Sequence, residues 1–243
     1  MNIKDKVVII TGASSGIGLA TARLLSKQGA KLALAARTKK KLDDLSIELS
    51  DSISIPTDMT KIAEIKRMVE KTIEHFGRVD ILINNAGQGY DASTEKTNID
   101  TVHYIFDLDV IGPLVAMQQV IPYMRKQGGG TIINVSSGTA LMYLPNMGAY
   151  SAIKRALANI SLTAREELKN DNITVSVVYP YMTLTNFEKN TIKDIPETED
   201  EQEDFNRPPL DTAEYLAQKI LDGIKSGDAE IFAHDWMKKR DDK

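Results

Sequence analysis

The stretch Val7-Val8-Ile9-Ile10-Thr11-Gly12-Ala13-Ser14-Ser15-Gly16-Ile17-Gly18 decides the fold of this chain. Its four consecutive apolar residues predict a strand covered on both faces, and the glycines that follow open a helix. Gly12 permits a tight turn, Gly16 lets the backbone approach a phosphate, and Gly18 allows close helix packing. Free N–H groups and the helix dipole would face a pyrophosphate, although a tight strand–helix turn without a nucleotide also favours glycine. We expect cofactor contacts from the loop residues Gly12, Ser14, Ser15, Gly16, Ile17 and Gly18.

Short β-rich runs alternate with longer amphipathic stretches through the rest of the 243 residues. Strands are expected at 6–10, 31–35, 52–55, 79–83, 131–135, 173–178 and 230–233. Helices are expected at 17–28, 40–49, 62–75, 101–126, 149–170 and 212–225. This alternation predicts an α/β fold, a doubly wound (Rossmann) seven-stranded parallel sheet with helices on both faces. Because no Pro/Ser-rich linker divides the chain, residues 1–243 are expected to form a single domain.

The composition argues against several classes of function. With 30 Lys and Arg against 34 Asp and Glu, the net charge of −4 gives no reason to expect a nucleic-acid partner. Cysteine is absent, which removes disulfides and thiolate metal sites and fits a reducing compartment. The three histidines, His75, His103 and His234, have no ligand spacing, so no metal site is expected.

No membrane partner is expected either. The longest apolar runs are only a few residues long, whereas a bilayer span needs about 20. The N-terminal residues run directly into the first expected strand and leave no room for a signal peptide. We therefore expect a cytoplasmic protein.

Residues 183–210 break the alternation of strands and helices. This segment contains Pro196, Pro208 and Pro209, and its eight acidic and three basic residues give it a net charge of −5. It follows the sixth expected strand and so lies at the carboxyl edge of the sheet, where ligands bind in this architecture. We interpret it as a lid-like substrate segment, with an ordinary solvated loop as the alternative.

The end of the second expected strand indicates which nucleotide is bound. NAD sites usually have an acidic residue there that binds the ribose hydroxyls, whereas an Arg can bind the 2′-phosphate of NADP. Here the acid is replaced by Ala36, and Arg37 follows it. Lys39, Lys40 and Lys41 then begin a helix, where positive charge is unfavourable unless an anion lies nearby. The sequence thus favours NADP(H), with a solvated basic turn as the alternative.

A third cluster carries the chemistry. Ser136-Ser137 ends a strand, and Tyr150 and Lys154 share one helix face because they are four residues apart. A phenol with its usual pKa of about 10 carries protons poorly at neutral pH, and an ammonium one turn away lowers that pKa. Ser137 is placed to donate a hydrogen bond to a carbonyl oxygen beside the phenol. The same Tyr-x-x-x-Lys spacing recurs at Tyr215 and Lys219, so the context and not the spacing makes the first pair specific.

Together these motifs resemble the short-chain dehydrogenase/reductase family along essentially the whole chain. The matching motifs are Thr-Gly-x-x-x-Gly-x-Gly at 11–18, Asn84-Asn85-Ala86-Gly87, Ser137 thirteen residues before Tyr150, and Tyr150-x-x-x-Lys154. The resemblance implies that Tyr150 is the general acid/base and that Ser137 orients the substrate oxygen. It also implies that Lys154 binds the nicotinamide ribose and lowers the pKa of Tyr150.

The resemblance implies further cofactor contacts. Asp58 matches the adenine contact of the family, although a turn or helix cap explains it equally well. The other residues that match cofactor positions are Asn85, Ala86, Gly87, Pro180 and Thr185. The long helices expected at 101–126 and 149–170 resemble the subunit contacts of the family, which implies a homodimer or homotetramer.

Two residues depart from the pattern of the family. Asp109 stands where the family has an active-site Asn, and if ionised it would raise the pKa of Tyr150. A tolerated substitution without effect is the alternative. Tyr181 replaces the usual Gly after Pro180, close to the expected nicotinamide pocket.

The expected function is NADP(H)-dependent hydride transfer between nicotinamide and a small-molecule carbonyl or secondary alcohol substrate. A catalytically weak NADP(H)-binding sensor or scaffold is the alternative from another class, since Asp109 and Tyr181 depart from the family. A 3-oxoacyl-carrier-protein reductase is a further possibility within the enzyme class. The acidic segment at 183–210 disfavours it, because acyl carrier proteins are acidic and would be repelled.

Overall fold

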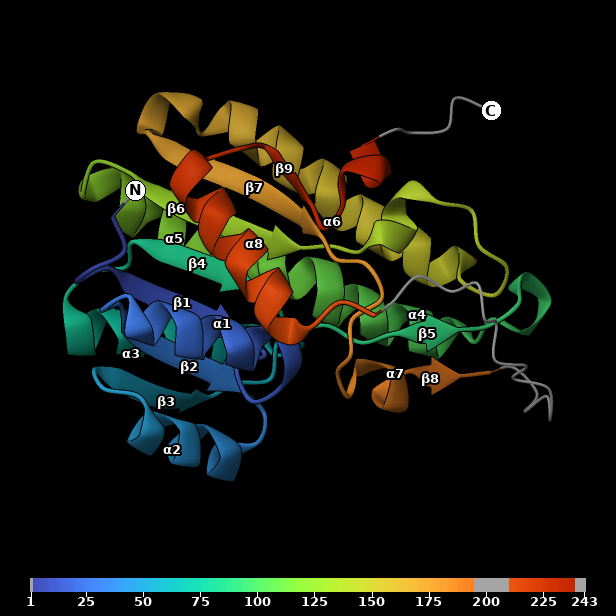
Figure 1. The fold of residues 1–243 in the computed structure, drawn as a ribbon, viewed down its shortest axis with the longest axis horizontal. Helices are drawn as coiled ribbons and strands as arrows, with labels where there is room; N and C mark the ends of the chain where they lie inside the picture. Colours follow the sequence, from blue (N-terminus) through green and yellow to red (C-terminus); the bar gives the residue numbers. More distant parts are fainter. Residues whose placement is uncertain (1, 195–209, 239–243) are drawn as a thin grey trace.

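The computed structural model describes residues 2–194 and 210–238. All strands of its main sheet run parallel, in the order β3-β2-β1-β4-β6-β7-β9 (Figure 1). The strands are β1 (Val7–Thr11), β2 (Lys31–Ala36), β3 (Ser52–Pro56), β4 (Ile81–Asn84), β6 (Gly130–Val135), β7 (Ile173–Tyr179) and β9 (Glu230–Phe232). The predicted doubly wound seven-stranded parallel sheet is confirmed.

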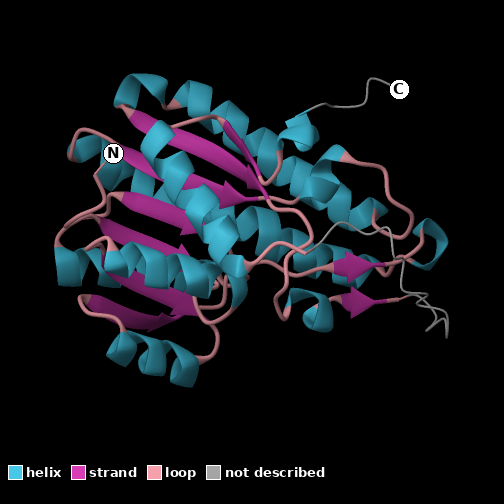
Figure 2. Cartoon of the chain, in the orientation of Figure 1, coloured by secondary structure: helices cyan, strands magenta, loops and turns pink. Residues whose placement is uncertain are grey.

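Helices cover both faces of this sheet (Figure 2). One face carries α1 (Gly16–Lys27), α2 (Lys39–Glu48) and α8 (Ala213–Ser226), and the other carries α3 (Ile62–Phe76), α5 (Gly112–Lys126) and α6 (Gly148–Glu167). Alternate residues of β1 enter different cores, since Val8 packs with the α1 side and Ile9 with the α3 side. This two-sided burial is why β1 is apolar at consecutive positions.

The expected helix at 101–126 is helical throughout, but a π-helical turn separates its two α-helical parts. α4 (Ile99–Phe106) runs into a π-helical turn, Asp107–Ile111, and then into α5. Gly112 begins α5 where a Cβ would collide with the carbonyl oxygen of Met59, so only glycine fits this crossing. Within the described residues, this is the one helix long and apolar enough to cross a membrane, although 56% of its most apolar 18-residue window is buried in the core.

The sequence analysis missed a small second sheet. β5 (Tyr90–Asp91) pairs in parallel with β8 (Ile192–Lys193), and the short helix α7 (Phe187–Asn190) precedes β8. These strands are only two residues long, which is too short for an alternating pattern to show. The remainder of the expected lid, 195–209, lies outside the described residues.

The two ends of that charged segment are joined at its neck. Thr183 and Asp211 form an isolated parallel bridge. The amide of Leu184 donates to the carbonyl oxygen of Asp211 (2.8 Å). The amide of Asp211 donates to the carbonyl oxygen of Met182 (2.8 Å). Main-chain hydrogen bonds therefore hold the two ends of the segment together.

A buried polar chain links the central strands to α6. The Asn84 amide on β4 donates to Oδ1 of Asn134 on β6 (2.8 Å), and the Asn134 amide donates to Oγ of Ser161 on α6 (2.7 Å). All three side chains are almost completely buried. Since buried polar groups need partners, Asn134 provides an acceptor for the Asn84 amide and a donor for the Ser161 hydroxyl oxygen.

Replacing Asn134 should therefore destabilise the fold. We expect Asn134→Ala to lower the free energy of unfolding by roughly 2–4 kcal/mol, because it leaves two buried groups without their partner. The exposed Asn159 on α6 offers a matched control, and Asn159→Ala should change this energy by less than about 0.5 kcal/mol. Urea unfolding followed by circular dichroism measures both. Equal midpoints for the two variants would contradict this role of Asn134.

Candidate active site

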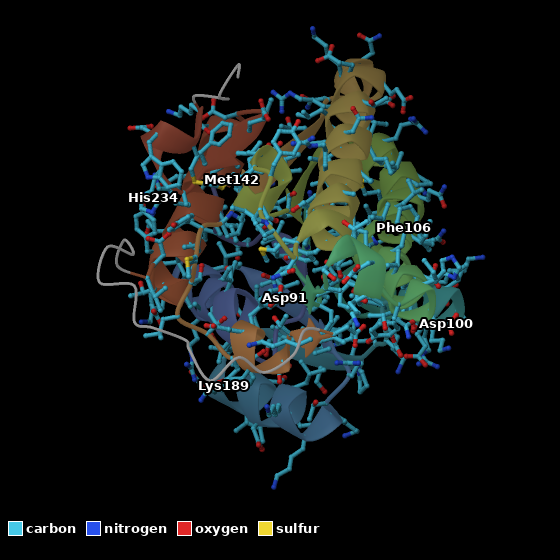
Figure 3. The ribbon with its side chains drawn as sticks, turned by 90° about the vertical axis from the view of Figure 1, so that its right-hand side faces the viewer. Asp91, Asp100, Phe106, Met142, Lys189 and His234 are labelled. Atoms are coloured by element: carbon cyan, nitrogen blue, oxygen red, sulfur yellow. The ribbon has the colours of Figure 1, made fainter. Side chains whose placement is uncertain are left out.

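The predicted site residues gather at one edge of the main sheet. Because the strands are parallel, each strand–helix turn on this side follows the carboxyl end of a strand. Gly12 follows β1, Arg37 follows β2, Asn85 follows β4, Ser137 follows β6 and Pro180 follows β7. Figure 3 looks onto this edge, with Asp91 labelled near its middle.

Thr11 and Asn85 join the glycine loop to the loop after β4. The hydroxyl oxygen of Thr11 accepts hydrogen bonds from the amides of Asn85 (2.9 Å) and Ala86 (3.0 Å). The side-chain amide of Asn85 donates to the carbonyl oxygen of Thr11 (3.0 Å). Gly12 has φ +67°, and a Cβ there would lie 2.8 Å from this amide. The turn thus requires glycine because of its conformation and because of its neighbour.

The start of α1 offers free donors to an anion. Ser15 caps the helix in an extended conformation, but its side chain makes no capping hydrogen bond within the described part of the chain. The first turn contains no acidic residue. The amides of this turn therefore remain available, and the helix dipole favours a negative group beside them.

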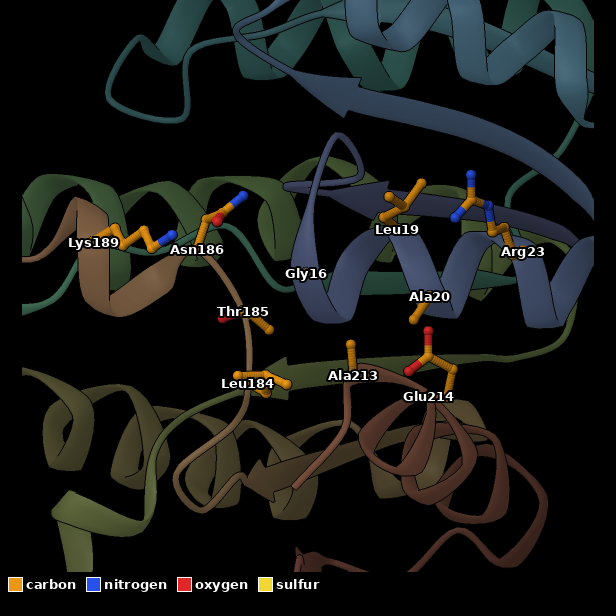
Figure 4. Close-up of a pocket in the computed structure, with 10 residues that line it drawn as sticks. All are labelled: Gly16, Leu19, Ala20, Arg23, Leu184, Thr185, Asn186, Lys189, Ala213 and Glu214. Atoms are coloured by element: carbon orange, nitrogen blue, oxygen red, sulfur yellow. The ribbon is translucent and has the colours of Figure 1, made fainter. Parts of the chain in front are cut away.

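A cavity of about 410 Å³ opens beside Gly16 (Figure 4). It lies between α1 and the segment that follows β7, and a Cβ on Gly16 would lie 3.3 Å from Thr185. Its lining residues are Gly16, Leu19, Ala20, Arg23, Leu184, Thr185, Asn186, Lys189, Ala213 and Glu214. The cavity thus adjoins two predicted cofactor contacts, Gly16 and Thr185, but not Tyr150.

Arg37 follows β2 at this edge of the sheet. Its side chain is exposed, and its guanidinium donates to the hydroxyl oxygen of Tyr104 on α4 (3.2 Å). α2 begins at Lys39 with three consecutive lysines and no acidic residue in its first turn. Lys39 itself pairs with Asp43 one turn later (2.5 Å). The positive charge expected at this helix start is therefore present, and Tyr104 is a neighbour that the sequence did not indicate.

Asp58 forms a turn, which the sequence analysis gave as the alternative to an adenine contact. Its Oδ1 accepts from the amide (2.9 Å) and the hydroxyl (2.9 Å) of Thr60. Its own amide donates to Glu64 (2.8 Å). This geometry is an Asx turn before α3, so Asp58 has a structural role whether or not it also contacts an adenine.

Ser137, Tyr150 and Lys154 lie together. Tyr150 and Lys154 are buried on α6, and the Lys154 ammonium nitrogen lies 5.9 Å from the centre of the Tyr150 ring. The hydroxyl oxygen of Ser137 accepts from the amide (3.2 Å) and the hydroxyl (3.0 Å) of Thr139. Because Thr139 occupies these acceptor positions, the Ser137 proton is left to donate elsewhere.

Asp109 forms a buried ion pair with Lys154. Its Oδ2 lies 2.8 Å from Nζ of Lys154, and the two side chains are 0% and 4% exposed. Its Oδ1 accepts from the amide of Gln88 (3.1 Å), and Nζ of Lys154 also donates to the carbonyl oxygen of Val135 (3.2 Å). The π-helical turn on α4–α5 carries Asp109, and such turns are frequent at functional sites.

The surroundings shift the protonation of both groups. Burial alone lowers the pKa of Lys154, but the charges of Asp109 and Tyr150 and the contact with Asp109 together raise it above the ordinary value. Burial raises the pKa of Tyr150, and Asp109 and Asp91 raise it further. Lys154 and a hydrogen bond from Ser137 act in the opposite direction. The predicted effect of Asp109 on Tyr150 therefore has the expected sign.

Residues outside the family motifs also border this site. Phe187 on α7 lies 6.3 Å from the Tyr150 ring, and a Cβ on Gly89 would touch Phe187 and Thr191. Tyr181 packs in T-shaped contact with Trp236 (5.1 Å) and His234 (5.9 Å), so its ring belongs to an aromatic cluster near the C-terminus. Phe187 could have been singled out as an aromatic residue in a charged segment, whereas Asp91 and Thr139 carry no sequence signal.

Tyr215 and Lys219, the second pair with the same spacing, are arranged differently. The hydroxyl of Tyr215 donates to the carbonyl oxygen of Ala233 (2.5 Å), and Lys219 lies over its ring at 5.4 Å. This pair on α8 packs against the turn after β9.

Comparison with known proteins places this arrangement in a family. The family model for short chain dehydrogenase matches residues 6–196. An uncharacterized oxidoreductase of Staphylococcus saprophyticus is 41% identical over 183 residues, which is 74% of each chain. A short-chain dehydrogenase from Streptomyces avermitilis superposes with a TM-score of 0.85 at 26% identity, covering 98% of this chain and 91% of that one. A 3-ketoacyl-(acyl-carrier-protein) reductase from Brucella melitensis, complexed with NADH, superposes with a TM-score of 0.85 at 25% identity. This match covers 95% of this chain and 97% of the reductase. The predicted resemblance is confirmed, and this chain is an oxidoreductase of the short-chain dehydrogenase family.

Proposed function

We propose that this protein is an NADP(H)-dependent oxidoreductase that transfers a hydride between nicotinamide and a carbonyl or secondary alcohol substrate. The observation that carries the proposal is the placing of Ser137, Tyr150 and the ion-paired Lys154 at the same sheet edge as the open glycine loop. The cofactor, when bound, supplies the hydride. The chain supplies binding, orientation and the proton.

The glycine loop fits a dinucleotide. Its turn brings backbone amides to the uncapped start of α1, where a pyrophosphate would be stabilised by hydrogen bonds and by the helix dipole. Ser14, Ser15 and Ile17 would contribute there, while Asn85, Ala86 and Gly87 would border the ribose. The cavity beside Gly16 and Thr185 leaves room at this point.

The preference for NADP(H) rests on charge. Arg37 is exposed beside the end of β2, and α2 begins with three lysines, of which Lys39 pairs with Asp43 one turn later. A 2′-phosphate bound here would neutralise part of this charge and accept a bidentate contact from Arg37. The Brucella melitensis reductase holds NADH, so this preference is argued from the residues of this chain alone.

Tyr150 would exchange the proton with the substrate oxygen. Burial and the charge of Asp109 hold the pKa of Tyr150 above its ordinary value, while Lys154 and a hydrogen bond from Ser137 act against this shift. A bound carbonyl oxygen would accept from Ser137 in place of the Tyr150 oxygen. Lys154 would also hold the nicotinamide ribose. In the direction of reduction Tyr150 acts as the acid, and in the direction of oxidation it acts as the base.

Asp109 would tune this proton transfer. Its carboxylate fixes Lys154 at 2.8 Å and raises the pKa of Tyr150. A higher pKa keeps the phenol protonated at more alkaline pH, which extends reductase activity in that direction. The alternative sensor or scaffold function would follow if this shift abolished useful turnover.

A 3-oxoacyl-carrier-protein reductase is the second candidate within the family. The likeness to the Brucella melitensis reductase favours it, while the acidic segment at 183–210 opposes docking of an acidic carrier protein. We further propose a cytoplasmic homodimer or homotetramer, on the family resemblance of the helices at 99–126 and 148–167.

Tyr150→Phe tests the proposed proton donor. We expect turnover to fall below detection because the ring remains but the proton donor is lost, while NADPH affinity stays within a few-fold of that of the parent. NADPH oxidation with a panel of ketones and aldehydes measures turnover, and fluorescence titration measures cofactor binding. Tyr215→Phe is the matched control with the same spacing to a lysine. Near-normal turnover of the Tyr150 variant would reject the assigned role.

Arg37→Ala tests the cofactor preference. Loss of a charged hydrogen bond should weaken NADPH binding by about 1.5–3 kcal/mol, or roughly 10- to 100-fold, and leave NADH binding almost unchanged. Arg67→Ala, on the remote helix α3, serves as the control. Calorimetric titration with both nucleotides measures the effect, and equal affinities of the parent protein for NADH and NADPH would remove the basis of the preference.

Asp109→Asn tests the tuning of Tyr150. Because the ionised carboxylate raises the pKa of Tyr150, its removal should lower that pKa, so the alkaline limb of the reductase profile should move to lower pH. Asp107→Asn, on the exposed side of the same π-helical turn, should leave the profile in place. Initial rates measured across neutral to alkaline pH give the curves. Superimposable curves for Asp109→Asn and the parent would contradict the role.

A further inference from the structure

The turn after Ser137 is anchored on both sides. The short 3₁₀ helix η3 begins directly after Ser137 and spans Gly138–Leu141. Its first amide donates to the carbonyl oxygen of Pro180, which follows β7 (2.7 Å). The carbonyl oxygen of Ala140 accepts from Nε of Arg155 on α6 (2.8 Å). The turn is thus tied to the end of β7 on one side and to α6 on the other.

One residue of this turn, Thr139, gives two hydrogen bonds to Ser137. Its amide donates to Oγ of Ser137 (3.2 Å), and its hydroxyl donates to the same oxygen (3.0 Å). The first is the capping bond of η3, which every residue except proline at this position makes through its backbone. The second needs a hydroxyl at this position. The second bond is therefore a property of the threonine side chain and not of the turn.

These two bonds determine where the Ser137 proton points. A hydroxyl oxygen has two acceptor positions and one proton. Thr139 fills both acceptor positions, so the proton is directed away from Thr139. In the structure it is donated to the Tyr150 oxygen, where it acts to lower the pKa of the phenol. Because linked hydrogen bonds polarise one another, a hydroxyl that accepts twice is also the stronger donor.

The Thr139 hydroxyl has no competing partner in the described part of the chain, where its bond to Ser137 is its one hydrogen bond. The carbonyl oxygen of Thr139 accepts from the amide of Met142 (3.1 Å), which closes the turn. Threonine is also β-branched, so its side chain has few rotamers available. A fixed backbone and a restricted side chain thus hold this hydroxyl in place beside Ser137.

We propose that Thr139 is a positioning residue, whose hydroxyl directs the Ser137 proton to the oxygen of the carbonyl or alcohol substrate. A bound carbonyl oxygen takes the place of the Tyr150 oxygen as the acceptor from Ser137, while both bonds from Thr139 persist. Without the Thr139 hydroxyl, Ser137 keeps one donor, and its proton has a second direction open to it. This inference rests on the proposed function, because it concerns the same substrate oxygen.

Thr139→Val tests this role, because valine keeps the shape and the backbone amide and removes the hydroxyl. We expect kcat/KM for a ketone, measured with saturating NADPH, to fall roughly 2- to 10-fold, as the loss of one neutral hydrogen bond allows. Thr139→Ser restores the donor and should recover most of this loss. Thr72→Val is the matched control, because it removes a hydroxyl that donates to the carbonyl oxygen of Met68 on α3 (2.8 Å), and it should leave kcat/KM unchanged.

A double-mutant cycle separates positioning of Ser137 from general damage to the site. If Thr139 acts through Ser137, adding Thr139→Val to Ser137→Ala should leave kcat/KM unchanged, because the hydroxyl that Thr139 positions is already absent. The same loss in both backgrounds, no loss in Thr139→Val, or no recovery in Thr139→Ser overturns the inference and leaves the proposed function standing.

The same cycle read by NMR needs no turnover. In protein isotope-labelled at Cζ of tyrosine, the Tyr150 signal is identified by its loss in Tyr150→Phe, and its chemical shift follows the hydrogen bonds that the phenol oxygen accepts. We expect Thr139→Val to move this signal when Ser137 is present and to leave it in place in Ser137→Ala. A signal that stays in place in both backgrounds, or moves equally in both, overturns the inference. A parent that reduces no ketone counts against the proposed function alone, and this measurement then decides on Thr139.

Discussion

The parallel pairing of all seven strands is the constraint on which the site depends. It forces every strand to be followed by a crossover, and it brings the carboxyl ends of β1, β2, β4, β6 and β7 to one edge. Residues separated by more than seventy positions thereby become neighbours. Thr11 shows this most directly, because its single hydroxyl accepts two amides from the loop after β4. The glycine loop and the loop bearing Asn85 are thus one rigid unit.

The ion pair of Lys154 and Asp109 is the second constraint. Two buried charges carry a desolvation penalty that only close pairing and additional hydrogen bonds offset. Both conditions hold, since the pair is 2.8 Å long and each partner has a backbone contact, through Val135 and Gln88. The position of Lys154 therefore depends on the helix formed by α4 and α5, which lies between β4 and β6 in the chain. Through Lys154, the environment of Tyr150 depends on the same helix. Asp109 is a buried residue of the π-helical turn in this helix, and from there its carboxylate contacts Lys154.

Much of this organisation could be predicted from the sequence. The consecutive apolar residues of β1 indicated burial on both faces, and the expected helices and strands lie within three residues of the observed ones. The spacing of Tyr150 and Lys154 correctly placed both on one face of α6. These features are local, so periodicity and turn chemistry are sufficient to reveal them.

The features that escaped prediction depend on contacts between distant segments. The pairing of β5 with β8 joins residues about a hundred positions apart over only two residues each, and no local pattern encodes it. The contact of Arg37 with Tyr104 follows from the packing of α4. The interruption of the helix at 99–126 was missed for a different reason, because a π-helical turn of five residues is too short for its own period to show in the sequence.

The bridge between Thr183 and Asp211 has a consequence for how such enzymes diversify. Because the chain closes upon itself at this neck, insertions or deletions beyond it need not disturb β7 or α8. The entropy of closing a loop grows slowly, by only about 0.6 kcal/mol for each doubling of length. Chimaeras that exchange this segment between relatives at Thr183 and Asp211 would therefore keep β7 and α8, and they would replace Thr185, Phe187 and β8, which lie against Gly16, Tyr150 and β5.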